Sequence, residues 1–213
     1  MLALTKTAYN QDIFFVLLLV SFLLISIIKG IYWKHSKLFF LGIFAQRYAN
    51  QFLREENAFT ERVSFFTFFL MLINITLFIA KLLVINDLRS LMGIFFAVFT
   101  FYIVKIIVIK SLGALFKVSD LSKLAIFFSF LFDKAFGLIL FPILLLFYYL
   151  SFDITYTILI TSIFLFILIF ILKLFWLWKI GSNSFGIHRV YIFLYLCILE
   201  LFPILLLVKR LFY

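Results

Sequence analysis

An acidic residue lies in the middle of an apolar, helix-length stretch near the end of this 213-residue sequence. The stretch reads HRVYIFLYLCILELFPILLLVKR, from His188 to Arg210, and carries Glu200 near its centre and Pro203 one helical turn later. An ionisable side chain at the centre of a membrane helix costs about 2.5–3.5 kcal/mol on insertion scales, so it marks a functional-site hypothesis. Pro203 breaks the hydrogen-bond ladder beside it. Glu200 and Pro203 are therefore the first candidates for an intramembrane polar site.

Three roles fit Glu200. As a neutral acid it would hydrogen-bond to Asn74 or to a Tyr hydroxyl and hold helices together, with a bond worth about 0.6–2 kcal/mol. As a proton or ligand site it would titrate, with a pKa raised by desolvation unless a cation such as Lys134 or a partner subunit neutralises it. It would otherwise contact another subunit. Asn74 lies in the middle of another apolar run and is interpreted mainly as an interhelical hydrogen-bonding residue.

No constellation of catalytic residues accompanies this acid. The sequence has no HExxH motif, no GxSxG motif and no Gly-rich phosphate loop. Cys197 is the one cysteine, which excludes an intrachain disulfide and a cysteine-type zinc site. His35 and His188 have no evident third ligand of matching type. We expect no catalytic residue, no metal and no cofactor.

The elements that carry these residues are predicted to be membrane helices. The composition is 67% hydrophobic and 13% charged, with a mean hydropathy of +1.28, whereas soluble domains carry about 25% charged residues. Apolar runs of the ~20 residues needed to cross a hydrocarbon core recur along the chain. The runs are continuously apolar, which favours helices over the alternating strands of a barrel. The prediction is an all-α, polytopic helical membrane protein with one or two interfacial amphipathic helices.

Residues 1–213 are predicted to form a single integral membrane domain with about six transmembrane helices. They are placed at 13–33, 63–84, 91–109, 134–150, 154–173 and 188–209. The fourth region has two interpretations: one long tilted helix, or a short amphipathic piece (119–132) that precedes a span. We favour the second, because it puts Asp133 and Lys134 at an interface. Lys105, near the end of the third helix, is expected to extend its amine to the membrane surface.

The segment 34–62 is the long polar stretch of the sequence and is predicted to be amphipathic. Apolar residues recur through it at roughly helical spacing: Leu38, Leu41, Phe44, Tyr48, Phe52 and Phe59. A helix of this pattern lies in the headgroup region of a membrane. A helix that covers the cytoplasmic ends of the bundle would show the same pattern, and both alternatives stay open.

The distribution of basic residues predicts the orientation. Thirteen Lys and Arg residues fall in segments 29–62, 105–123 and 173–189, and five fall on the other side: Lys6, Lys81, Arg89, Lys209 and Arg210. The side richer in Lys and Arg is cytoplasmic, so six helices would leave both termini in the periplasm. This rule also accounts for the net charge of +10 without a nucleic-acid partner.

Two stretches resemble a known family. FLREENAFTERVSFF (52–66) and YIFLYLCILELFPILLLVK (191–209) are similar to a family of uncharacterised bacterial polytopic membrane proteins, a domain of unknown function. The LYLCxLExxP pattern falls here on Leu194, Tyr195, Leu196, Cys197, Leu199, Glu200 and Pro203. The resemblance covers roughly residue 50 to the end and implies an inner-membrane location. It adds interest to Glu200 and to Arg54, Glu55, Glu56 and Asn57.

The function expected from these observations is that of a non-enzymatic integral membrane subunit or scaffold of a larger inner-membrane complex, for example protein-export or envelope machinery. Membrane lipid and other membrane protein subunits would be its partners. Its polar docking surface would be the cytoplasmic segment Arg54, Glu55, Glu56 and Asn57. The alternative is a small transporter or proton-coupled carrier that uses Glu200 and Asn74.

Overall fold

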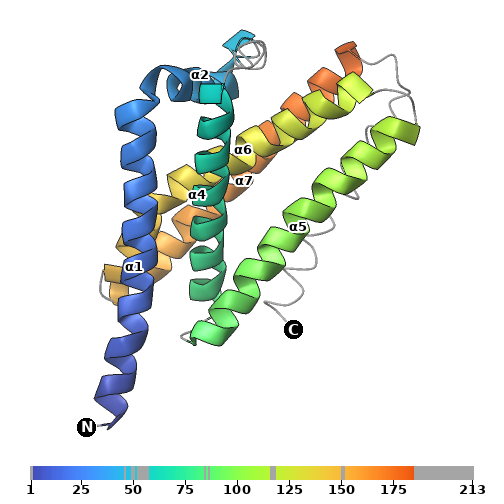
Figure 1. Ribbon diagram of the computed structural model, residues 1–213. Coiled ribbons are helices and arrows are strands. Elements are labelled where there is room, and N and C mark those ends of the chain that lie inside the picture. Colours follow the sequence, from blue (N-terminus) through green and yellow to red (C-terminus); the bar gives the residue numbers. More distant parts are fainter. Residues whose placement is uncertain are drawn as a thin grey trace. The chain divides into compact units, whose positions relative to one another are not determined.

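The computed structural model describes residues 2–45, 47–48, 51, 58–83, 85, 87–115, 119–149 and 152–184. This part of the chain is helical, with six helices and no strand. The helices are α1 (Leu2–Ile31), α2 (Trp33–Phe44), α4 (Ala58–Leu82), α5 (Leu88–Leu115), α6 (Ser119–Tyr149) and α7 (Phe152–Ser184) (Figure 1). The predicted all-helical class is thereby confirmed for the described residues.

Four of these helices are long and apolar enough to cross a membrane. The spans are Asp12–Ile31 in α1, Phe59–Leu82 in α4, Leu88–Ser111 in α5 and Ile126–Tyr149 in α6. In α7 the apolar part among the described residues is shorter, Ile160–Trp176. The four spans overlap the first four predicted helices, and the shorter apolar part of α7 overlaps the fifth. A continuous apolar run of span length is stable as a helix in lipid whatever packs beside it. The sixth predicted helix, 188–209, lies outside the described residues.

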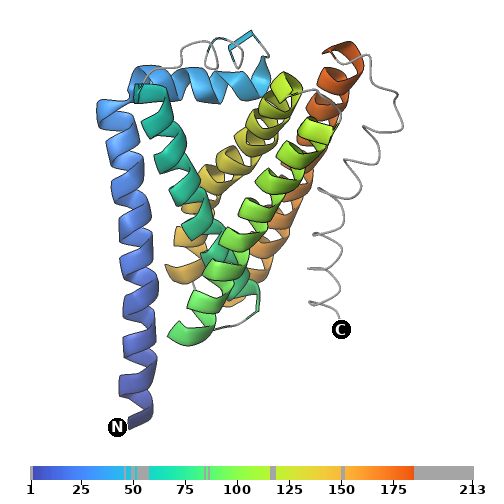
Figure 2. The ribbon, with the colours of Figure 1, turned by 45° about the vertical axis from the view of Figure 1, so that its right-hand side comes forward.

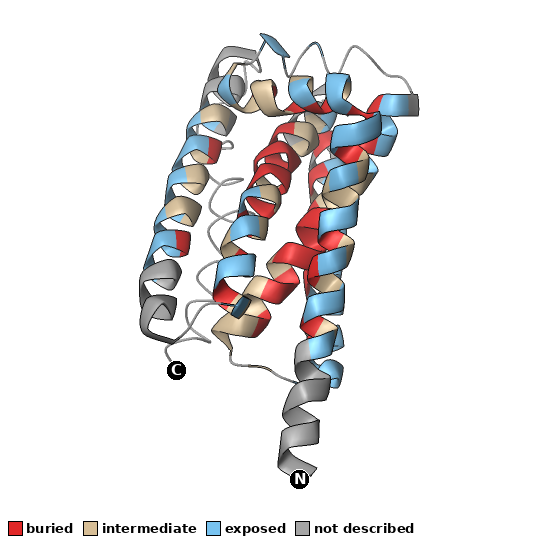
Figure 3. Cartoon of the chain, turned by 90° about the vertical axis from the view of Figure 1, so that its left-hand side faces the viewer, coloured by how far each residue is buried: buried red, intermediate tan, exposed pale blue. Residues whose placement is uncertain are grey.

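The chain divides into two compact units. The first unit comprises Met1–Thr100 and Leu131–Phe166, and the second comprises Phe101–Phe130 and Ile167–Tyr213. In the first unit α4 contacts both α1 and α2, and 61% of the α4 span is buried, against 22% of the α1 span. Figure 3 shows α1, which begins at the mark N, exposed along much of its outer side. The core of this unit therefore lies around α4.

The first two helices meet in a sharp bend. α1 ends at Ile31, α2 begins at Trp33, and Tyr32 between them has φ −115° and ψ 22°. The sequence predicted a first helix up to residue 33 and a separate amphipathic segment from residue 34, and in the structure the break between the two helices falls at Tyr32. Tyr32 is buried, with its ring centroid 6.1 Å from that of Phe59 and 6.0 Å from that of Phe66. Packing of this side chain against α4 fixes the bend, and local sequence does not show it.

Helix α2 lies across the ends of α1 and α4 (Figures 1 and 2). Its buried residues are Ser36, Phe39 and Gly42. The buried face is therefore not the one that the sequence predicted. Of the residues expected to form the apolar face, Leu38 and Leu41 are half-buried and Phe44 is 78% exposed. The buried face of α2 covers the ends of α1 and α4, which corresponds to one of the two alternatives for this segment. The rest of the predicted segment is divided, because α4 begins at Ala58 and takes residues 58–62 into its first turns.

Helix α6 runs without interruption from Ser119 to Tyr149. The favoured prediction of a separate piece before Asp133 and Lys134 was wrong, and the single long helix is the one found. The reason is that Lys134 has a polar neighbour inside the first unit, as described below, so its charge needs no position at an interface. Pro142 lies within the same helix and is exposed, which keeps its ring away from the packed side.

Candidate functional site

Asn74 is the centre of a hydrogen-bonded cluster in the first unit. It lies on α4, and its side chain is fully buried. Its Oδ1 accepts a hydrogen bond from Ser21 Oγ on α1 at 3.0 Å, and its Nδ2 donates to the backbone carbonyl oxygen of Gly137 on α6 at 2.7 Å. One amide thus connects three helices, which is the interhelical role that its position in the sequence favoured.

Gly137 makes this cluster possible. A Cβ added at Gly137 would lie 2.6 Å from the Cα and 2.8 Å from the Cβ of Met71 on α4. Only a glycine lets the two backbones approach so closely, as small residues do wherever membrane helices meet. The short distance brings the carbonyl group of residue 137 within reach of the Asn74 amide. The sequence contained this residue without a signal that set it apart from the other glycines.

Lys134 forms a second polar contact, one helical turn before Gly137. Its side chain is 8% exposed, and its Nζ donates a hydrogen bond to Ser64 Oγ on α4 at 2.6 Å. The same Nζ lies 6.0 Å from the ring centroid of Phe39 on α2. The amine therefore interacts with a hydroxyl and an aromatic face, both of which stabilise an ammonium ion.

The predicted partner of Lys134 was Glu200, and this pairing stays a prediction. Glu200 and Pro203 lie outside the described residues. So do Arg54, Glu55, Glu56 and Asn57, the proposed docking residues. Of the predicted intramembrane site the structure describes Asn74 and Lys134. Both lie in the first unit and bond between α4 and α6, but they form separate hydrogen bonds: Asn74 bonds to Gly137, and Lys134 bonds to Ser64.

A third group of contacts was missed in the sequence. Tyr148, near the end of α6, donates its hydroxyl to the carbonyl oxygen of Leu77 on α4 at 3.1 Å. Its ring stacks on Phe14 of α1, with centroids 4.9 Å apart, and Lys81 Nζ lies 4.9 Å from its centroid. The signal available was a Tyr inside an apolar run, because a buried Tyr usually finds a partner for its hydroxyl.

Two threonine hydroxyls of α4 bond within their own helix. Thr67 Oγ1 donates to the carbonyl oxygen of Val63, and Thr76 Oγ1 donates to that of Leu72, both at 2.7 Å. Such bonds satisfy a hydroxyl in lipid without a second helix. Hydrogen bonds between α4 and its neighbouring helices thus involve the side chains of Ser21, Asn74, Lys134 and Tyr148.

Lys105 in the second unit differs from the prediction. Its amine was expected to reach the membrane surface, but the side chain is 2% exposed. Its Nζ lies 6.0 Å from the ring centroid of Tyr102 and 5.9 Å from that of Phe130. Two aromatic rings therefore lie close to an amine that hydropathy alone would place in water. Trp176 stacks on Phe128 in the same unit, with centroids 6.4 Å apart.

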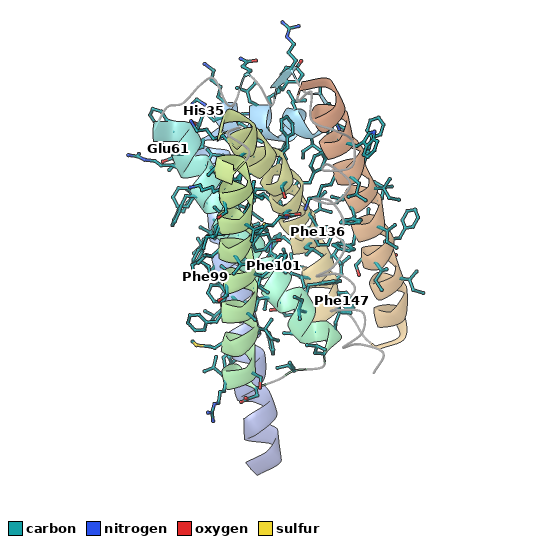
Figure 4. The ribbon with its side chains drawn as sticks, turned by 90° about the vertical axis from the view of Figure 1, so that its right-hand side faces the viewer. His35, Glu61, Phe99, Phe101, Phe136 and Phe147 are labelled. Atoms are coloured by element: carbon teal, nitrogen blue, oxygen red, sulfur yellow. The ribbon has the colours of Figure 1, made fainter. Side chains whose placement is uncertain are left out.

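The chemistry that these groups can perform is hydrogen bonding between helices. Within the residues that the structure describes, no group of three or more His, Cys, Asp and Glu side chains could hold a metal ion. His35 on α2 is half-buried, and its ring lies parallel to that of Phe59 with centroids 5.8 Å apart. Figure 4 shows His35 and Glu61 near each other at one end of the first unit and Phe147 toward the other end.

Comparison with known proteins gives one match. The model of a family described as a domain of unknown function, DUF4271, matches residues 14–211 of the chain. No curated protein and no solved structure matches the chain.

Proposed function

This chain belongs to the DUF4271 family, whose description assigns no activity. From the contacts described above we propose that it is a non-enzymatic integral membrane subunit or scaffold of a larger inner-membrane complex. Protein-export or envelope machinery is the kind of assembly we have in mind. The helices long and apolar enough to cross a membrane would form its body, with membrane lipid and other membrane subunits as partners.

The proposal rests on the hydrogen bonds of the Asn74 side chain. Both ends of its amide bond to neighbouring helices, Ser21 on one side and the Gly137 carbonyl on the other. A polar group that binds a solute must exchange partners during transport, whereas a group that holds helices together keeps them. The amide between α1, α4 and α6 therefore favours a fixed body over a moving one, as a scaffold requires.

The test is to isolate the assembly intact. The tagged chain is extracted from its native membrane in mild detergent and analysed by native mass spectrometry, which gives stoichiometry as well as mass. We expect a defined complex with other membrane subunits in fixed ratio. A chain that purifies alone, as a monomer or homodimer, would contradict the proposal.

Substitutions in segment 54–57 test where the partner binds. Arg54, Glu55 and Glu56 would be its polar docking residues, on the cytoplasmic side. Glu55→Gln with Glu56→Gln should release the partner, and Asp12→Asn serves as the matched control because Asp12 is an exposed acid on α1. Equal release by both variants would indicate a general effect of charge and would contradict docking at this segment.

Orientation is proposed on the basic residues alone. The cytoplasmic side would hold segment 29–62, and both termini would lie in the periplasm of a bacterial cell. Fusing alkaline phosphatase or a green fluorescent protein to each terminus tests this. Phosphatase activity at both ends is expected, and fluorescence at either end would contradict the orientation.

One observation favours a second candidate, a small proton-coupled carrier. Lys134 lies in the α6 span and is 8% exposed as a residue, and a buried ionisable group in a membrane helix is a feature of proton relays. Glu200, the predicted acid, would be the other member. Glu200→Gln should then abolish flux in proteoliposomes while the protein stays folded, and unchanged flux would remove this candidate.

A further inference from the structure

Three aromatic side chains in α2 and at its N-terminus hold the helix against α4 and the Lys134 amine. Tyr32 packs on Phe59 and Phe66, His35 stacks on Phe59, and Phe39 is 2% exposed beside the Lys134 amine. These contacts fix the rotation of α2 about its own axis. Which residues it exposes is therefore a property of the fold.

The level of α2 relative to the membrane follows from α1. The α1 span ends at Ile31, and α2 begins at Trp33, across the ends of α1 and α4 (Figure 2). A helix that turns sideways where a span ends lies along the membrane surface, at the level of the lipid headgroups. The end of the first unit that carries α2 is therefore an interfacial one.

The exposed side of α2 combines aromatic and basic residues. Trp33 is 55% exposed, and Lys34, Lys37 and the preceding Lys29 are exposed as well. The sequence has no acidic residue between Asp12 and Glu55. The nearest acid on the described part of α4, Glu61, is followed directly by Arg62, so this neighbouring turn adds no net negative charge.

We propose that this exposed side of α2, together with Lys29, binds the headgroups of anionic phospholipids in the membrane that holds the chain. Lys34 and Lys37, three residues apart on the helix, contact the headgroup phosphates. Trp33 lies at the level of the glycerol backbone, where its ring meets apolar chains and its N–H meets polar groups. This ligand class goes beyond the scaffold role, which requires no particular lipid.

Charge and apolar character together select lipid over an acidic protein segment. An acidic segment would need the lysines but would leave Trp33 and the 78% exposed Phe44 in water. A lipid surface contacts both kinds of side chain at once. A lysine near an anionic membrane surface contributes roughly a fivefold preference at moderate salt, so two of them together account for a preference of about 25-fold.

Native mass spectrometry tests this surface directly. The full-length protein is equilibrated in mild detergent with equal amounts of phosphatidylglycerol and phosphatidylcholine, and the retained lipids are counted. The wild type should retain phosphatidylglycerol about 25-fold in excess. Lys34→Gln with Lys37→Gln should abolish that excess, and Lys34→Arg with Lys37→Arg should preserve it.

The matched control removes two exposed lysines elsewhere, by Lys110→Gln with Lys123→Gln. It should keep the excess of phosphatidylglycerol, and a loss equal to that of the α2 variant would overturn the proposal. So would a wild type without lipid preference, which would leave an acidic protein segment as the partner. Inorganic phosphate in excess should leave the lipid bound, because displacement by phosphate would show a free-anion site instead. Circular dichroism verifies that each variant remains folded.

Discussion

Replacing Gly137 with alanine should force α4 and α6 apart. The new Cβ would lie 2.6 Å from Met71 Cα, about 0.8 Å short of the 3.4 Å at which ordinary van der Waals contact begins. Backbone atoms cannot rotate away as a side-chain end can, so the helices must separate. The same movement would lengthen the 2.7 Å bond between the Asn74 amide and the Gly137 carbonyl to about 3.5 Å, beyond the range of a good hydrogen bond.

The expected loss of stability follows from these two effects. Overpacking costs about 1–3 kcal/mol, and losing an interhelical bond in a membrane costs about 0.6–1.7 kcal/mol. The higher helix propensity of alanine than of glycine offsets up to about 1 kcal/mol of this loss. The Gly137→Ala variant should therefore lose roughly 0.6–4.7 kcal/mol of unfolding free energy, measured by titration with sodium dodecyl sulfate and followed by circular dichroism.

Gly93 provides the matched control. A Cβ added there meets no atom within 4 Å, so Gly93→Ala should leave stability unchanged or raise it slightly. The Asn74→Ala variant completes a double-mutant cycle with Gly137→Ala. If the alanine at 137 already breaks the bond, removing the amide as well should cost less than it does in the wild type. Equal stability of the two alanine variants at 137 and 93, or strict additivity in the cycle, would refute the close-approach explanation.

Three further sets of substitutions test the polar contacts by the same titration. Ser21→Ala and Asn74→Ala should couple by about 0.6 kcal/mol in a double-mutant cycle, because each removes the same bond; purely additive losses would contradict that bond. Lys134→Met should leave stability unchanged or raise it, since it removes the desolvation of a buried ammonium, whereas Ser64→Ala should lower it by about 1 kcal/mol or more; the reverse order would contradict the contact. Tyr148→Phe should cost less than about 1.7 kcal/mol and far less than Tyr148→Ala, which also loses the stacked ring.

The class of the fold was predictable because it depends on local information. Runs such as 63–84 and 91–109 are long and apolar in themselves, and each became part of a helix that could cross a membrane, α4 or α5. No packing partner had to be known. The same holds for Asn74, since a buried amide in lipid needs partners wherever it lies.

The errors came from contacts between segments far apart in the sequence. Lys134 was treated as a charge that needs an interface, because its neighbour Ser64 is 70 residues away. Tyr32 was assigned to the first helix, because the aromatic residues that fix its bend belong to α4. Gly137 could not be singled out, since its importance depends on Met71 of another helix. Each of these contacts has to be observed.

The lengths of the spans determine how the first unit adapts to the thickness of its membrane. The α1 span has 20 residues and the α4 and α6 spans have 24 each, which correspond to about 30 Å and about 36 Å of helix. A hydrocarbon core of about 30 Å matches an upright α1, whereas the longer spans fit it when tilted by roughly 35°. Because Asn74 ties α1, α4 and α6 together, a thinner or thicker bilayer has to tilt all three helices at once, so the unit should distinguish membranes by their thickness.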